Sequence, residues 1–360
     1  MDSITIGVLL PNSTIFPISK EFEKGLKEGL KSHNIEVELV KEFIGGGDIK
    51  LTENACNKFF SFDDVDIVTG VISNKAAATI AERFKGKGIP LLVNNPGGHV
   101  PPVAEYNEYL FINSMHLWRH AWTLGHWGVQ TFGKKGMYLA AVYDAGYGFS
   151  QMFYEGMMAA GATAADWSFS VPPMPQGGGL TDMSIIFPFL EQYQPDFIFA
   201  NFCGAETTLF LNEFIARGWH HKTKVLGLPY LLAPFEPLND DLTVYTTLPI
   251  EEAPEVSAAA AFRYLGLQAG KYISEAAANA IGKAELRAEL AKIPALFNVA
   301  SGIISAATQL TLLEHTITAG NTEISSKALT RHQAFPIDIP KLTQLTAQPG
   351  AGWFNPYLGI

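Results

Sequence analysis

The sequence predicts an α/β protein of two lobes, each built on a mainly parallel sheet with helices on both faces. Three observations lead to this class. A chain of 360 residues is longer than a single hydrophobic core usually supports. Short β-branched apolar runs alternate with amphipathic segments, which is the pattern of right-handed βαβ units. The alternation starts again near residue 117, so we expect the same architecture twice along the chain.

Composition narrows the classes of function. Apolar residues make up 48% of the chain and charged residues 17%, as expected of a folded globular protein. The net charge of −10 argues against a nucleic-acid partner, because phosphate binding needs clustered Lys and Arg and no basic stripe is present. No apolar run reaches the roughly 18 residues of a membrane span, so we expect no membrane insertion.

The first residues and the cysteines leave the compartment open. Met1-Asp2-Ser3 leads almost at once into an apolar strand, without the basic and apolar regions of a signal peptide. The protein is therefore either cytoplasmic, or periplasmic or otherwise extracytoplasmic with a signal peptide already removed. Cys56 and Cys203 are far apart in the sequence and fall in different predicted lobes, so we expect no disulfide between them.

The first unit, up to residue 117, shows the alternation most regularly. Phe22, Leu26 and Leu30 are spaced four residues apart, which places them on one face of a helix. We expect strands at 4–10, 37–43, 67–71, 89–93 and 110–113, and helices at 19–33, 51–61 and 74–84.

The second unit repeats this order after an aromatic helix at 118–132. We expect strands at 137–143, 164–171, 197–202, 224–228 and 244–248, and helices at 148–160, 183–193 and 207–217. We expect two long helices, at 258–281 and 299–318, to return to the first lobe. The N-terminal lobe is then 1–117 plus about 250–334, and the C-terminal lobe is 118–249 plus about 335–360, joined by a multi-strand hinge.

Four stretches together resemble a known family. They are "ITIGVLLPNS", "VDIVTGVISNKAAATIAERFKGKGIPLLVNN", "LAAVYDAGYGFSQMFYEGMMAAGA" and "PDFIFANFCGAETTLFLNEFIARGW". In order and spacing they resemble the type I periplasmic-binding-protein fold. The nearest group is the substrate-binding proteins of branched-chain amino acid ABC transporters, which are similar to leucine/isoleucine/valine-binding proteins. The resemblance implies two lobes that close on a small-molecule ligand and present it to a transporter permease.

One loop departs from the pattern of that family. In amino-acid-binding relatives the loop after the fourth strand usually carries Ser, Ala and Thr, which hold the ligand carboxylate. Here the loop reads Asn94-Asn95-Pro96-Gly97-Gly98. This departure argues against an ordinary branched-chain amino acid as the ligand. The final C-terminal segment also matches the family poorly.

Four polar residues follow two neighbouring strands of the first lobe. Ser73 and Asn74 lie where a helix begins, and the N–H groups and partial positive charge of a helix N-terminus suit an anionic group. The alternative is a plain Ser N-cap. The side-chain amides of Asn94 and Asn95 can donate to and accept from a polar ligand, or serve only as turn residues. We expect all four to contact the ligand.

The strongest indication of ligand-binding residues in the second lobe lies at the end of its first expected strand. Tyr143 and Asp144 are followed by Tyr147-Gly148. Asp144 can pair with a ligand ammonium group or cap the next helix, and Tyr147 can cover the ligand as an amphipathic lid. We include Tyr143, Asp144 and Tyr147 among the ligand-binding candidates.

Three further candidates follow later strands of the second lobe. Cys203 and Glu206 come after the apolar run 197–202, and Tyr230 comes after 224–228. In relatives an acidic residue of this lobe commonly binds the ligand amino group, which implies that role for Glu206. The alternative is that Glu206 complements the dipole of its helix. Cys203 is small enough to be a buried filler.

The histidines do not predict a metal site. Zinc sites need three or four converging ligands. His116, His120 and His126 do not share one helical face, and no Cys or carboxylate accompanies them. We interpret His220-His221 as a solvated loop pair.

We find no catalytic or cofactor motif. The glycine triplets lack the Lys-Ser/Thr of a phosphate loop, and there is no G-x-S-x-G or H-E-x-x-H sequence. Carboxylate pairs such as Asp240-Asp241 are adjacent residues in polar segments, which we interpret as solvated turns. We therefore expect no cofactor and no catalytic residues.

The expected function is capture of a small polar organic molecule, an amino acid or a related carboxylate or amide, between the lobes. An ABC transporter permease is the partner that the resemblance implies. One alternative is a ligand-sensing regulatory protein of the same fold. Another is an α/β enzyme that uses Asp144 or Glu206 as a base.

Overall fold

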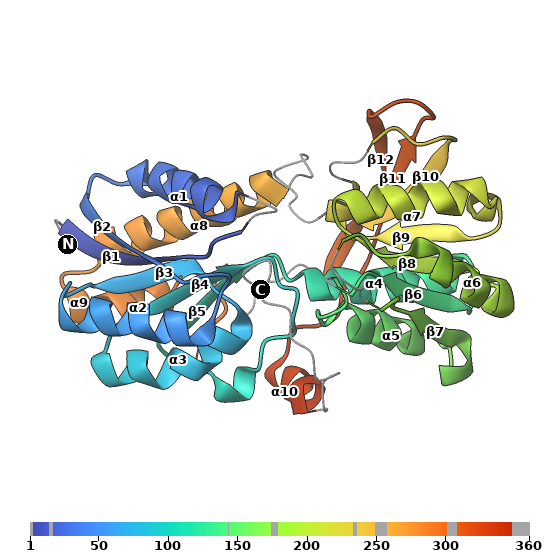
Figure 1. The fold of residues 1–360 in the computed structure, drawn as a ribbon. Helices are drawn as coiled ribbons and strands as arrows, with labels where there is room; N and C mark the ends of the chain where they lie inside the picture. Colours follow the sequence, from blue (N-terminus) through green and yellow to red (C-terminus); the bar gives the residue numbers. More distant parts are fainter. Residues whose placement is uncertain are drawn as a thin grey trace.

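The computed structural model describes residues 3–13, 17–142, 144–173, 179–232, 236–248, 258–300 and 308–347. Two sheets organise this part of the chain (Figure 1). The first is parallel throughout, in the order β2 (Glu36–Phe43), β1 (Ser3–Leu10), β3 (Ile67–Val71), β4 (Leu91–Asn95) and β5 (Leu110–Ser114). The alternation of strands and helices in the sequence therefore yields the predicted parallel sheet.

Helices cover both faces of the first sheet. Figure 1 shows α1 (Ile18–Gly29) and α8 (Ala258–Asn279) over one face, and α2 (Ile49–Ser61) and α3 (Asn74–Lys87) over the other. Ile6 and Val8 of β1 pack with Phe22 of α1 and Leu265 of α8, and all four side chains are buried. The short helix α9 (Lys283–Leu290) follows α8.

The second sheet has seven strands and a mixed direction. Its order is β12 (Ile324–Gln333), β11 (Gln309–Ile317), β10 (Leu242–Thr247), β9 (Lys224–Gly227), β8 (Phe197–Asn201), β6 (Gly136–Ala140) and β7 (Trp167–Ser170). The strands from β6 to β10 run parallel, and β11 and β12 are antiparallel additions. The helices are α4 (Leu117–Thr131), α5 (Phe149–Ala159), α6 (Phe187–Tyr193) and α7 (Ala205–Ala216). The two-lobed α/β class predicted from the sequence is thus confirmed.

The prediction of a helix at 299–318 is wrong. Residues 309–317 form strand β11, which pairs with β10 and with β12. Its sequence, QLTLLEHTI, is rich in Leu and Thr, and over so few residues it fits both the helical and the strand period of apolar residues. Pairing with neighbouring strands therefore decides its conformation. The remaining part of the expected helix includes residues 301–307, which lie outside the described residues.

The expected lobe boundaries near the C-terminus need correction as well. Strands β11 and β12 lie within 250–334, yet they join the sheet of the second lobe. The last described helix, α10 (Ile339–Ala347), packs in the same hydrophobic cluster as Val103 of the first lobe, through Leu342 and Leu345. Figure 1 shows α10 below the junction of the lobes.

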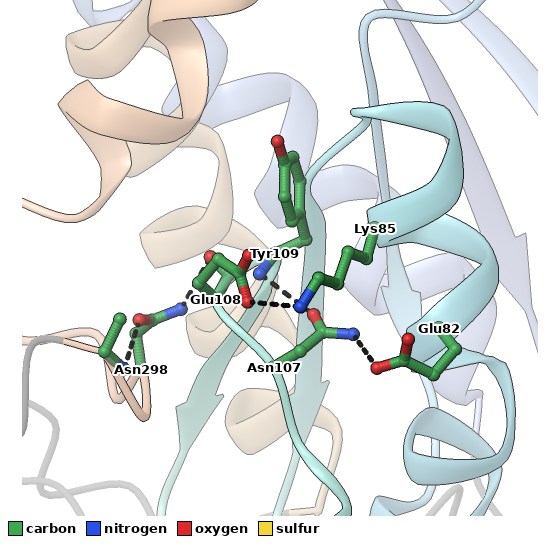
Figure 2. Close-up of polar contacts among 7 residues, drawn as sticks. Glu82, Lys85, Asn107, Glu108, Tyr109 and Asn298 are labelled. Carbon is green, nitrogen blue, oxygen red and sulfur yellow. Dashed lines mark hydrogen bonds and ion pairs between the residues drawn. The ribbon is translucent and has the colours of Figure 1, made fainter.

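The chain that follows α9 is fixed to the edge of the first sheet. Phe297 exchanges two backbone hydrogen bonds with Ile112 of β5, at 2.9 and 3.1 Å. The side-chain amide of Asn298 donates to the carbonyls of Leu110 and Glu108. Figure 2 shows the adjoining loop, in which Glu108 also pairs with Lys85 of α3. These contacts cover the otherwise open edge of β5.

Helices α1 and α8 approach each other closely through glycines. A Cβ atom on Gly25 would overlap the backbone carbonyl of Arg263, and one on Gly266 would overlap the carbonyl of Phe22. The two backbones are therefore in direct contact at this crossing. None of the described helices, including the 22-residue α8, is long and apolar enough to span a membrane.

We predict opposite effects of alanine at two helical glycines. Gly25→Ala forces α1 away from α8, so the free energy of unfolding should fall by about 1–3 kcal/mol. Gly86→Ala in α3 has nothing within 4 Å of the added Cβ, and it should raise stability by about 0.5–1 kcal/mol through helix propensity. Urea unfolding followed by tryptophan fluorescence measures both changes. Equal effects of the two substitutions would contradict the close crossing.

Candidate functional site

Polar side chains gather where β3 and β4 end. Ser73 is the N-cap of α3, and its Oγ accepts a hydrogen bond from the N–H of Ala76 at 3.1 Å. The amide of Asn95 donates to Asn74 Oδ1 at 2.9 Å, and the amide of Asn74 donates to the carbonyl of His99 at 3.0 Å. Ser73, Asn74 and Asn95 are thus brought together, and we name them the first-lobe rim. All three are buried.

Asn94, a ligand-binding candidate from the sequence, points elsewhere. Its Nδ2 donates to Thr69 Oγ1 and to the carbonyl of Gly70, and its Oδ1 accepts from Asn113 at 2.8 Å. The residue is fully buried, and both amide hydrogens are used within the protein. Asn94 therefore binds β3, β4 and β5 to one another, a role that residue type alone does not reveal.

The second lobe has a comparable centre, which the sequence analysis missed. Asn201, the fully buried last residue of β8, donates to the hydroxyl of Tyr138 at 2.7 Å and to the carbonyl of Asp144 at 2.6 Å. The hydroxyl of Tyr230 donates to Asn201 Oδ1. An Asn in the otherwise apolar run Phe197–Asn201 was the available signal, since a buried amide must find partners.

Two carboxylates lie beside this centre. Glu206 is buried near the start of α7, and its Oε1 accepts from the N–H of Thr181 at 2.8 Å and from the Thr181 hydroxyl. Burial, and then the negative charge of Glu206, raise the pKa of Asp144 to about 7, against a smaller opposing effect of a backbone hydrogen bond from Cys203. No ion pair to either carboxylate is found among the described residues.

Cys203 and Tyr230 complete this group. We name its five residues the second-lobe rim: Asp144, Asn201, Cys203, Glu206 and Tyr230. Burial, followed by the charges of Asp144 and Glu206, raises the pKa of the Cys203 thiol to about 12, so it is protonated near neutral pH and a poor nucleophile. Burial likewise raises the pKa of Tyr230 well above its usual value. Both cysteines are free.

The two lobes touch through loops that adjoin these rims. The N–H of Gly148 donates to the carbonyl of Gly98 at 2.9 Å, and the rings of His99 and Tyr147 lie 5.6 Å apart. Tyr147 is only 6% exposed. These contacts join the loop after β4 to the loop after β6, so the carboxyl ends of the two sheets face each other here. Tyr143, the remaining candidate, lies outside the described residues.

Comparison with known proteins now identifies the family. A family model described as "Periplasmic binding protein" matches residues 3–301. The chain belongs to the periplasmic binding protein family. This match confirms the resemblance recognised in the sequence, and the two-lobed fold agrees with it.

Solved structures share the fold of this periplasmic binding protein at low sequence identity. An ABC transporter substrate-binding protein from Sphaerobacter thermophilus has a TM-score of 0.67 and 19% identity, over 92% of this chain and 98% of that chain. A leucine-binding protein from Thermotoga maritima has a TM-score of 0.62 and 17% identity, over 92% of this chain and 99% of that chain. A solute-binding protein from Rhodopseudomonas palustris, in complex with 3,4-dihydroxybenzoic acid, has a TM-score of 0.64 and 15% identity, over 95% of this chain and 100% of that chain. No curated protein matches the chain.

We predict that Asp144→Asn stabilises the protein at high pH. The pKa of Asp144 is raised in the fold from 3.8 to about 7, so the native state loses stability as the pH rises through that window. Above pH 7 the variant should exceed the wild type in free energy of unfolding by up to about 4 kcal/mol, and the difference should vanish below about pH 4. Urea unfolding between pH 4 and pH 8 measures it.

Asp166→Asn is the matched control. A hydrogen bond from Thr163 holds the pKa of the exposed Asp166 below its usual value, so this substitution should have the opposite sign at high pH. A difference between Asp144→Asn and wild type that does not change with pH would refute the assignment of a raised pKa to Asp144.

Proposed function

We propose that this protein is an extracytoplasmic solute-binding protein that captures one small polar organic molecule between its lobes. The ligand is an amino acid or a related carboxylate or amide, and the closed protein delivers it to an ABC transporter permease. The observation that carries the proposal is the contact between His99 and Tyr147, which joins the loops that adjoin the two rims.

The rims differ in charge, which supports a ligand with a cationic group. The first-lobe rim consists of a hydroxyl and neutral amides at the N-terminus of α3, where the helix dipole favours an anionic group. The second-lobe rim has two acidic side chains, Asp144 and Glu206, close enough for one to raise the pKa of the other. A zwitterion satisfies both rims at once, with its carboxylate at α3 and its ammonium at the carboxylates.

Aromatic side chains favour an apolar part of the ligand beside its polar groups. The rings of Tyr147 and Phe149 lie 5.4 Å apart, and Phe149 in turn lies 6.4 Å from Tyr230. Structural relatives include both a leucine-binding protein and a complex with an aromatic carboxylate, so ring-bearing ligands belong in any test. The acidic pair distinguishes the two classes, since only the amino acid has an ammonium group.

Ligand capture by this arrangement requires contacts from both lobes. A ligand that one lobe holds equally in the open and closed forms does not shift the equilibrium between them. The Gly98–Gly148 hydrogen bond joins a loop of each lobe, so we expect a molecule bound beside it to gain contacts only when the lobes approach.

We predict that Glu206→Gln separates the two ligand classes. Loss of the carboxylate should weaken binding of an amino acid by about 10- to 100-fold, the value of a hydrogen bond to a charged group. Binding of benzoate or 3,4-dihydroxybenzoate should stay the same or become tighter. Isothermal titration calorimetry with leucine, isoleucine, phenylalanine and the two benzoates measures this. Tyr147→Ala should weaken binding of either class.

Glu213→Gln is the matched control, because Glu213 lies exposed on the same helix and pairs with Arg217. It should leave every affinity unchanged. The proposed site is wrong if a ligand of the panel binds with equal affinity to wild type, Glu206→Gln and Tyr147→Ala. The proposed ligand class is wrong if no member of the panel binds the wild type.

A further inference from the structure

Two histidines and an aspartate converge at the other end of the second sheet. His220 and His221 belong to the short 3₁₀ helix η5 (Trp219–His221), which immediately precedes β9, and Asp240 precedes β10. They therefore lie at the amino ends of these parallel strands, whereas the second-lobe rim follows the carboxyl ends. One ligand atom from each of the three side chains lies within 4.8 Å of the others.

His220 differs from the solvated residue expected from the sequence. Its side chain is 6% exposed, and neither ring nitrogen has a hydrogen-bond partner in the described part of the chain. Its Nε2 lies 3.4 Å from Asp240 Oδ2, without the alignment of a hydrogen bond, and its ring centroid lies 3.8 Å from that of His221. A buried imidazole without a partner is costly, so its position points to a missing ligand.

We infer that His220, His221 and Asp240 form a site for a divalent transition-metal ion, with Zn²⁺ as the representative metal. Two imidazole nitrogens and one carboxylate oxygen are a common set of three protein ligands for zinc, with water in the fourth position. Each residue offers one ligand atom, and His221 and Asp240 are exposed, so the ion reaches the buried His220 from solvent.

The aspartate is already oriented for this role. The N–H of Asp241 donates to Asp240 Oδ1 at 2.8 Å, which leaves Oδ2 toward His220. Such hydrogen bonds to a ligating carboxylate fix its orientation around a metal. The same hydrogen bond lowers the pKa of Asp240, so the group is ionised near neutral pH.

The other close histidine pair, His126 and His332, differs from His220 in its hydrogen-bond partners. His126 Nδ1 lies 2.8 Å from His332 Nε2, and His126 Nε2 is in contact with the amide of Gln333. Both ring nitrogens of His126 thus have partners within the protein. Among the described residues, the cluster at η5 is the one group of three such ligands. A bound ion there would fix η5 to the start of β10 and stabilise the second lobe.

Metal titration tests the inference. Protein cleared with a chelator is titrated with Zn²⁺ by calorimetry and with Co²⁺ by its visible absorption, and the thermal midpoint is recorded with and without Zn²⁺. We expect saturable binding of one ion and a higher thermal midpoint. His220→Ala and Asp240→Asn should each weaken binding by at least about tenfold. His33→Ala, at an exposed histidine of the first lobe, should leave binding unchanged.

His221→Ala keeps the test decisive if the buried His220 cannot be replaced without loss of folding, because His221 is exposed. It should fold normally and bind Zn²⁺ at least about tenfold more weakly. The inference is overturned if the wild type binds no Zn²⁺ below ~1 mM. It is also overturned if these variants bind as tightly as the wild type.

Discussion

The loop at 95–99 is the constraint on which the arrangement of the lobes depends. A buried backbone carbonyl must find a donor, and each of the five consecutive carbonyls of this loop has one. The donors are the N–H groups of Met115, Leu117, Trp118 and Gly148 for residues 95–98 in turn, and the side-chain amide of Asn74 for residue 99. One short segment thereby joins the first-lobe rim, the first crossing between lobes and the second lobe.

The position of Gly97 in this loop explains why a glycine is needed there. Its φ is +80°, and a Cβ would lie 2.6 Å from the Cα of His116. The carbonyls of Pro96 and Gly97 cap the first N–H groups of α4, so this helix is tied to the first lobe at its start. If the rims separate while this junction stays intact, only one of the five hydrogen bonds breaks, the one donated by Gly148. One such bond contributes about 0.5–1.5 kcal/mol to the joined arrangement, in addition to the contact between His99 and Tyr147.

The sequence predicted the repeated α/β order well because buried parallel strands read as short apolar runs. Strand β3 lies at the expected 67–71, for example. Prediction failed where tertiary contacts decide, as in β11, which takes its conformation from its partners. The expected residues of the first-lobe rim do come together, but composition could not show that the amide of Asn94 is used internally or that Asn201 organises the other rim. Burial of His220 depends on chain packing that local sequence does not encode.

In the function proposed above, the chemistry of the two rims gives them different parts in recognition. In the first lobe, hydrogen bonds between Asn74, Asn95 and Ser114 fix the polar groups before any ligand arrives, which favours orientation at low entropic cost. In the second lobe, burial and then the negative charge of Glu206 disfavour the charged form of Asp144. In the function proposed above, a cationic group of the ligand beside these two carboxylates would offset the effect of Glu206 on Asp144, and only once the ligand reaches the second lobe. On that proposal, the charge of the ligand favours closure, whereas the neutral rim sets its position.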